Sequence, residues 1–325
     1  MDGRGTRITQ PALLALLALL APRAALAQGG GGVWGTRGGV WEQVVPSASG
    51  SPGPTQSYWH HATSVAGCFI VSGGSNDGVG NATFQYDPSQ NEWMQYPDLP
   101  QSFQGPAITS IGGWVLLFGG QGQAAMSYSN MALLISSSNP GLGWSNGTTP
   151  TTPPPRNGHR LVALGCWAYL MGGWDAVTYY NDVYALDVCS WFGNSTMSNG
   201  QVATWVQIAA NGAANVPPPR NSFSWDVYGA NTVVFGGFWH NIPAVGPGTN
   251  CDPDAQCTFY NDLWVFRPGN SGFPPTGGAG WTQITPSSSV APTGRFGHAS
   301  GIIANQLFVF GGTAIKAPGA PGQLL

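Results

Sequence analysis

The sequence of 325 residues predicts an all-β fold that is made of repeated four-stranded units. Five apolar runs end in a double glycine, and short segments that open with tryptophan recur between them. Glycine (49) and proline (27) are abundant, whereas only 7% of the residues are charged. Such a composition favours short strands and tight turns over amphipathic helices with charged faces. Four short strands in each repeat is the layout of a β-propeller blade.

The first two strands of each unit are predicted from the residues that lead into a double glycine. The pairs are Gly73–Gly74, Gly119–Gly120, Gly172–Gly173, Gly236–Gly237 and Gly311–Gly312. Arg156, Arg220 and Arg295 each stand 16 residues before the first glycine of their pair, in phrases such as the repeated "PPPRN". His60, His159 and His298 stand 13 residues before theirs. The constant offsets predict a strand–turn–strand hairpin of fixed size.

The third and fourth strands follow each double glycine at looser spacing. "YNDVYALD" (Tyr180–Asp187) and "YNDLWVF" (Tyr260–Phe266) alternate polar and apolar residues, as a half-buried strand does, and "ATFQYD" (Ala82–Asp87) is a weaker copy. A tryptophan then opens the fourth strand, at Trp41, Trp93, Trp144, Trp205 and Trp281. We expect these large rings to fill the space between neighbouring blades.

These motifs resemble the kelch repeat, over about Trp41 to Gly312. The double glycine, the "NDVY" strand, the spacing from Tyr86 to Trp93 and the phrases "PRNGH" and "GRFGH" carry the resemblance. It implies a kelch-type β-propeller in which the arginines bond to backbone or to neighbouring blades. The pattern predicts four complete blades plus partial first and last blades. Kelch propellers usually have more blades, closed by strands from both termini, so we expect a truncated chain.

The N-terminus has the layout of a secretory signal peptide. Arg4 and Arg7 precede an apolar core, Pro11–Ala21, and residues 1–27 end in the small-x-small pattern that precedes a cleavage site. The core is shorter than the roughly 20 residues that a membrane span needs, so we expect secretion and no span. A Gly-rich leader (28–40) follows, and the tail (313–325) predicts no strand and reads as disordered. A net charge of −3 without a basic run disfavours nucleic-acid partners.

Secretion makes the cysteines and sequons interpretable. Cys251 and Cys257 flank a short loop and are predicted to form a disulfide. Cys166 and Cys189 flank a predicted hairpin, and their pairing would set Met171 opposite Tyr184. Cys68 is left as an inert core thiol. Glycosylation is predicted at the sequons of Asn81, Asn146 and Asn194.

The sequence indicates binding rather than catalysis. It lacks the familiar metalloprotease, P-loop and hydrolase motifs, and we predict no cofactor and no metal. Loops beyond the double glycines, the longest from Phe238 to Phe259, would form one face of the ring and bind an unidentified protein or glycan. The candidate binding residues are Trp174, Tyr179, Trp239 and His240, which could instead cover blade edges. A copper oxidase that resembles galactose oxidase and acts on sugars or small aldehydes and alcohols is the alternative, although no Tyr–Cys–His set can be identified.

Overall fold

The structure is a computed structural model, and it describes residues 44–47, 49–50, 52–55, 57–75, 80–123, 127–147, 151–188, 204–240, 257–268, 280–287, 291–314 and 323–324. Within these ranges the elements are β-strands and one short 3-10 helix, η3 (Pro140–Leu142). The predicted fold class is therefore confirmed. Trp41, which we expected to open the first strand, lies outside the described residues.

Four antiparallel sheets of four strands form the complete blades. Blade 1 contains β1 (His61–Val65), β2 (Cys68–Ser72), β3 (Thr83–Asp87) and β4 (Glu92–Tyr96). Blade 2 contains β5 (Ala107–Ile111), β6 (Trp114–Phe118), β7 (Ala132–Ser136) and β8 (Ser145–Asn146). Blade 3 contains β9 (Arg160–Leu164), β10 (Trp167–Met171), β11 (Val183–Asp187) and β12 (Trp205–Ala209). Blade 4 contains β13 (Ser224–Tyr228), β14 (Asn231–Phe235), β17 (Leu263–Phe266) and β18 (Trp281–Ile284).

Three two-stranded sheets complete the described structure. Blade 5 consists of β19 (Ala299–Ile303) and β20 (Gln306–Phe310). A hairpin of β15 (Phe238–His240) and β16 (Cys257–Phe259) stands beyond the double glycine of blade 4. The chain also continues past Gly312 as β21 (Thr313–Ala314), which pairs with β22 (Gln323–Leu324), although the sequence predicts no strand there.

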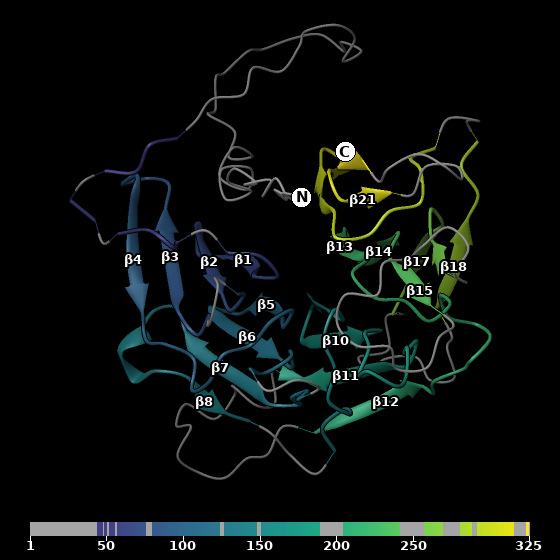
Figure 1. The fold of residues 1–325 in the computed structure, drawn as a ribbon, viewed down its shortest axis with the longest axis horizontal. Helices are drawn as coiled ribbons and strands as arrows, with labels where there is room; N and C mark the ends of the chain where they lie inside the picture. The colour runs from purple at the N-terminus through teal and green to yellow at the C-terminus, as the bar shows by residue number, and fades with distance from the viewer. Residues whose placement is uncertain are drawn as a thin grey trace, which may run out of the picture.

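The blades are arranged around a common axis. Their innermost strands β1, β5, β9, β13 and β19 contact one another in this order. Figure 1 looks along this axis and shows β4, β8, β12 and β18 at the outer rim. Apolar clusters fill the space between successive blades, because each sheet presents apolar residues on both faces. Trp205 of blade 3 packs against Phe118 of blade 2 with ring centroids 5.4 Å apart, as expected for a plate between blades.

In blades 1 to 4, the first glycine of the pair is required by the blade that follows it. Gly172 has φ 71°, and a Cβ there would lie 2.7 Å from the ring of Phe223 and 2.9 Å from the carbonyl oxygen of Arg220. The ring of His298 stands in the same way against Gly236. The residue 13 positions before one double glycine thus covers the double glycine of the preceding blade.

The offset of 16 residues between arginine and glycine corresponds to a hydrogen bond. Arg156 is fully buried and donates from Nη1 to the carbonyl oxygen of Gly172 at 3.0 Å. Its two Nη atoms also contact both carboxylate oxygens of Asp182 at 2.5 and 2.9 Å. Arg220 repeats the arrangement, with Gly236 at 2.9 Å and both oxygens of Asp262 at 2.7 Å. Each arginine therefore ties the entry of its blade to the second and third strands.

A chain of backbone hydrogen bonds, which we term the collar, links the five blades near the axis. Its members are Trp59, Gly105, Gly158, Ser222 and Gly297, each of which stands 14 residues before a double glycine. All five have φ between 54° and 63°, in the left-handed region. From the second member on, each N–H donates to the carbonyl oxygen of the member before it, at 2.8 to 3.1 Å. The collar thus runs in one direction, from blade 1 to blade 5.

The predicted hairpin of blade 3 is present, but its register differs by one residue. Met171 lies opposite Val183, and Tyr184 lies opposite Leu170. Met171 and Val183 are both fully buried in the cluster between blades 3 and 4, so burial of this face sets the register. Cys68 is a free, half-buried thiol. Cys189 and Cys251 lie outside the described residues, so both disulfide pairings stay predictions.

Candidate partner-binding face

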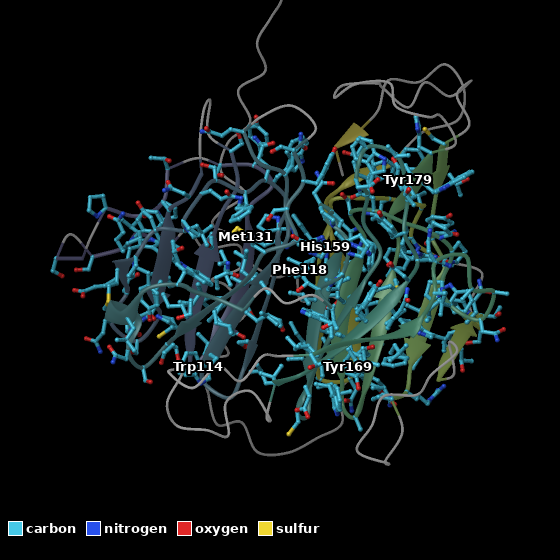
Figure 2. All side chains as sticks on the ribbon, turned by 90° about the horizontal axis from the view of Figure 1, so that it is seen from below. Trp114, Phe118, Met131, His159, Tyr169 and Tyr179 are labelled. Carbon is cyan, nitrogen blue, oxygen red and sulfur yellow. The ribbon has the colours of Figure 1, made fainter. Side chains whose placement is uncertain are left out.

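All five double glycines follow second strands, so the segments beyond them emerge on one end of the blades, which we term the glycine face. The residue after each pair forms a two-sided backbone bridge with the residue 17 positions earlier. The bridged pairs are Tyr58–Ser75, Gln104–Gln121, Asn157–Trp174, Asn221–Phe238 and Phe296–Thr313. Figure 2 shows Tyr179 at this end of the molecule and Trp114 at the opposite end. These bridges fix the backbone from which the side chains of the face project.

Six aromatic side chains form a continuous row across blades 2 to 5 of the glycine face. The members of this aromatic row are Tyr128, Trp174, Tyr179, Phe238, Phe259 and Phe296. Successive ring centroids are 5.8 Å apart from Tyr128 to Trp174, 5.9 Å to Tyr179 and 6.0 Å to Phe238. All six side chains are half-buried, so each keeps part of its ring in contact with solvent.

The structure brings two of the four predicted binding residues into this row. Trp174 and Tyr179 bridge each other through their backbones and contact each other through their rings. Trp239 and His240 lie in β15, opposite Thr258 and Cys257. Since side chains alternate along a strand, Trp239 points away from the side that carries Phe238. Trp239 and His240 are both half-buried.

Sequence reasoning missed Tyr128, Phe238, Phe259 and Phe296. A signal was present for two of them. Phe238 directly follows a double glycine, as Trp174 does, and Phe296 occupies the position of Asn157 in the repeat. Tyr128 and Phe259 come from the returning side of loops of different length, so no fixed offset identifies them.

The row is uncharged at neutral pH. Burial, and next the charge of Asp175, raise the pKa of Tyr128 to about 12. Burial and the neighbouring Tyr128 raise the pKa of Tyr179 as well. Side-chain amides accompany the rings: Asn157 donates to the Oε1 of Gln121 at 3.3 Å, and its own Oδ1 is buried without a protein partner. Aromatic rings beside amides suit apolar and hydrogen-bonding ligand groups rather than ions.

Exposed aromatic side chains extend the glycine face onto blade 1. Tyr58 and Trp59 are 54% and 59% exposed, and their ring centroids are 5.3 Å apart. Trp59 holds the left-handed backbone that the collar requires, with φ 57°. A large side chain at such a position is uncommon.

A cluster of charged and polar side chains lies on the innermost strands and links blades on opposite sides of the propeller axis. Arg160 of blade 3 donates from Nη1 to the His61 ring of blade 1 at 3.0 Å. Burial, and then the charge of Arg160, hold the pKa of His61 well below its usual value, so a neutral imidazole accepts this bond. Burial lowers the pKa of Arg160 to about 10, against the opposing effect of Asp226 on blade 4. Burial also raises the pKa of Asp226, while Ser300 of blade 5 and Arg160 counteract that rise. The cluster joins four blades through the hydrogen bonds Arg160–His61 and Ser300–Asp226 and through the charge interaction between Arg160 and Asp226.

The histidines at the repeated offset do not converge. His159 and His298 are buried beside glycines of different blades, and His159 contacts the carbonyl oxygen of Phe118 at 3.1 Å. Within the described ranges, no three His, Cys, Asp or Glu side chains are grouped so that they could hold a metal ion. No helix in the same part of the chain is long and apolar enough to span a membrane.

Comparison with known proteins places this fold in a family. The family model of the KLHDC2/KLHL20/DRC7 Kelch-repeats domain matches residues 59–312. Host cell factor 1 of Homo sapiens is 26% identical over 294 residues, which cover 84% of this chain and 12% of that protein. Adagio-like protein 3 of Oryza sativa subsp. japonica is 28% identical over 209 residues, which cover 63% of this chain and 27% of that protein.

A third relative, the Rab9 effector protein with kelch motifs of Gallus gallus, is 27% identical over 139 residues, which cover 39% of this chain and 37% of that protein. The chain thus spans well under half of the length of each of these relatives. The family model covers all four complete blades and blade 5. The chain belongs to the kelch-repeat family.

Proposed function

We propose that this protein is a secreted kelch propeller that binds a protein partner through the glycine face, with the aromatic row as the main contact. The row is the observation that carries the proposal: six half-buried, uncharged rings follow one another across four blades. Aromatic side chains are enriched at the centres of protein interfaces, because they bury a large area at a small cost in rotamer freedom. One relative is by its name an effector of Rab9, which fits a binding role.

A protein partner suits the row better than a glycan. A sugar ring stacks on an open aromatic face, whereas two of the ring contacts in this row meet edge to face. The planes of Tyr128 and Trp174 are 75° apart, and those of Tyr179 and Phe238 are 73° apart. Each such contact places an edge against a face and reduces the flat area that is left for stacking. A glycan is the alternative ligand that the experiment must exclude.

Secretion is supported by the N-terminal segment and by the sequons. Asn146 is exposed at the end of β8, where an attached glycan would project into solvent. Asn81 is half-buried, and its side-chain amide nitrogen lies 3.5 Å from the carbonyl oxygen of Leu99. We therefore expect Asn146 to be glycosylated in preference to Asn81. The disulfides Cys166–Cys189 and Cys251–Cys257 belong to the same proposal.

The test compares two faces of one protein. The chain is recovered from the medium of secreting cells, its N-terminus is read by mass spectrometry, and it is immobilised beside two variants. Trp174→Ala with Tyr179→Ala interrupts the aromatic row. Tyr228→Ala removes an exposed aromatic ring from the β13–β14 turn at the opposite end of the blades. We expect proteins captured by the parent to be retained by Tyr228→Ala and lost from the double variant, with all three melting alike.

Equal capture by all three proteins would contradict the proposal. A glycan array is probed in parallel with the same three proteins. Saturable glycan binding that the double variant loses, without any captured protein, would assign the face to glycans instead. An N-terminus that retains Met1 would remove the secretory part of the proposal and leave the binding face to be decided by capture.

A further inference from the structure

The residues that are bridged beyond the double glycines form a three-residue ladder, which recurs in blades 2, 3 and 4. Each ladder has an inner residue directly before the collar, a middle residue directly after the double glycine and an outer residue on the returning chain. Directly paired residues of antiparallel strands project their side chains to the same side, so each ladder presents three side chains together. The ladders are Gln104–Gln121–Tyr128, Asn157–Trp174–Tyr179 and Asn221–Phe238–Phe259.

The hydrogen-bonding capacity of the ladders falls from blade 2 to blade 4. Blade 2 contributes two glutamines and a tyrosine, and blade 3 contributes an asparagine, a tryptophan and a tyrosine. Blade 4 contributes Phe238 and Phe259, whose rings are stacked with planes 23° apart. Its third member, Asn221, already holds the hydroxyl of Ser222 at 2.7 Å through Oδ1. The glycine face therefore has a polar end over blades 2 and 3 and an apolar end over blade 4.

Two tyrosine hydroxyls at the polar end are left for a ligand. Tyr128 and Tyr179 flank Trp174 in the aromatic row, and both are half-buried. Neither hydroxyl has a hydrogen-bond partner in the part of the chain that the structure describes. The neighbouring Tyr180, by contrast, donates to Asp175 at 2.6 Å. A half-buried hydroxyl without a protein partner is a group that a ligand can bond.

The surroundings of these hydroxyls favour a neutral ligand group over an anion. Gln121 accepts from Asn157 through Oε1 at 3.3 Å, which leaves its Nε2 as a further donor. Arg156, directly before Asn157 in the chain, is fully buried in its own ion pair and is not available to neutralise an anion. The charge of Asp175 acts on Tyr128 and would repel an anion there. A side-chain amide both donates and accepts, as the hydroxyls do, without the cost of desolvating a charge.

We propose that the polar end of the glycine face binds a glutamine or asparagine side chain in an extended, uncharged segment of the partner protein. The amide bonds to the hydroxyls of Tyr128 and Tyr179 and to Gln121. An apolar residue farther along the segment packs on Phe238 and Phe259. This inference rests on the proposed function, because it specifies the segment that the aromatic row binds.

The spacing of the rings suits an extended segment. Ring centroids from Tyr128 through Trp174 and Tyr179 to Phe238 follow one another in steps of 5.8 to 6.0 Å. Alternate side chains of an extended chain are about 6.6 Å apart, so every second residue of the segment meets a new ring. The order of the ladders then sets the direction of the segment, with the amide over blades 2 and 3 and the apolar residue over blade 4.

Peptide pools test the proposal. Each pool holds eight-residue peptides, acetylated and amidated at their ends, with one fixed residue and mixed residues elsewhere, and its binding to the full chain is measured. We expect the glutamine pool to bind about five- to tenfold more tightly than the glutamate or the methionine pool, since one hydrogen bond or more is lost in either exchange. Tyr128→Phe with Tyr179→Phe removes both hydroxyls, keeps both rings and should abolish this preference. Tyr228→Phe alters an exposed tyrosine at the opposite end of the blades and should preserve it.

Four results would overturn the inference: no binding of any pool, equal binding of the three pools, a preference for glutamate, and a preference for glutamine that survives the loss of both hydroxyls. If the double variant does not fold, Tyr128→Phe and Tyr179→Phe are measured singly, and an unchanged preference in both refutes the inference.

Trp174→Ala with Tyr179→Ala distinguishes this failure from that of the proposed function. If this variant loses every pool while the parent shows no preference for glutamine, the aromatic row binds a partner and only the amide assignment is wrong. If it binds every pool as the parent does, the row is not the contact, and the inference and the proposed function fail together.

Discussion

Gly172 shows how one residue of the repeat meets two separate demands. Its φ of 71° is rarely adopted by side-chain-bearing residues, and the place of a Cβ is taken by Phe223 and by the carbonyl oxygen of Arg220. The turn at each double glycine could be predicted from the sequence, because the glycines recur after apolar runs. The contact with the next blade could not be predicted, since the ring that fills the space belongs to another blade and reaches it only through the tertiary fold.

A matched pair of substitutions separates these two demands. Gly165, in the turn between β9 and β10, has φ 61°, and a Cβ added there would meet nothing within 4 Å. Gly165→Ala should therefore cost only the backbone term, about 1–2 kcal/mol. Gly172→Ala should cost about 1–3 kcal/mol more from overpacking, because a backbone oxygen cannot move aside easily. Urea unfolding of both variants measures the difference, and equal losses would show that the contact with the next blade is unimportant.

Protonation of a single ring should also be measurable. Burial, and then Arg160 and Arg295, lower the pKa of His298 to about 3 from an ordinary value of 6.5. His298 is therefore protonated below pH 6.5 in the unfolded chain but only below about pH 3 in the folded chain. The free energy of unfolding falls as the pH falls through this window. Both ring nitrogens of His298 lack a protein hydrogen-bond partner, so a phenylalanine can replace the ring without breaking a bond to the protein.

His298→Phe should reduce the loss of stability between pH 7 and pH 4 relative to the parent, as followed by urea unfolding at each pH. Phe223 already occupies the equivalent place over Gly172, and it permits the reverse test. Phe223→His should increase the acid sensitivity. An unchanged pH dependence in both variants would mean that the buried ring is not the group that responds.

At the scale of the strand, the arginine–aspartate pair of blades 3 and 4 has an apolar counterpart in blade 2. Blade 2 has Phe103 and Met131 at the corresponding positions, and both contribute to the apolar cluster between blades 1 and 2. The sequence revealed the arginines by their offset but not the aspartates that they bind, because the glycine-to-aspartate spacing varies with loop length. The predicted register of β10 and β11 was wrong by one residue for a related reason. The prediction followed the positions of the cysteines, whereas burial of Met171 and Val183 determines the observed register.

Replacing the ion pair of blade 4 by the apolar residues that blade 2 has at the same positions tests whether the ion pair is needed. Arg220→Ala alone should destabilise blade 4 by about 3–5 kcal/mol, because the carbonyl oxygen of Gly236 loses the guanidinium donor and the charge of Asp262 keeps only the indole N–H of Trp264. Arg220→Phe combined with Asp262→Met copies blade 2 and should recover at least about half of that loss. Thermal and urea unfolding provide the comparison. A double variant as unstable as Arg220→Ala would show that the guanidinium is irreplaceable in this blade.

At the scale of the whole molecule, the propeller was predictable because repetition reveals architecture even when single elements are ambiguous. Only some of the aromatic residues of the candidate face could be predicted from the sequence. Trp174 and Tyr179 stand beside a double glycine, but the row that they join takes rings from four blades. Phe238 and Phe296, whose ring centroids are 4.6 Å apart, belong to different repeats of the sequence. No local pattern encodes such proximity.

The collar has a consequence for how such molecules change in evolution. Each link consists of one donor and one acceptor, and an internal member supplies both, so a unit inserted anywhere along the arc brings both groups and leaves the hydrogen-bond count balanced. Loss of a whole unit is equally neutral, because the flanking members can join directly. Loss of part of a unit is not neutral, since it leaves a donor or an acceptor without its partner near the axis. Duplication and deletion of entire repeats are therefore the low-cost steps by which a ring of this construction gains or loses blades.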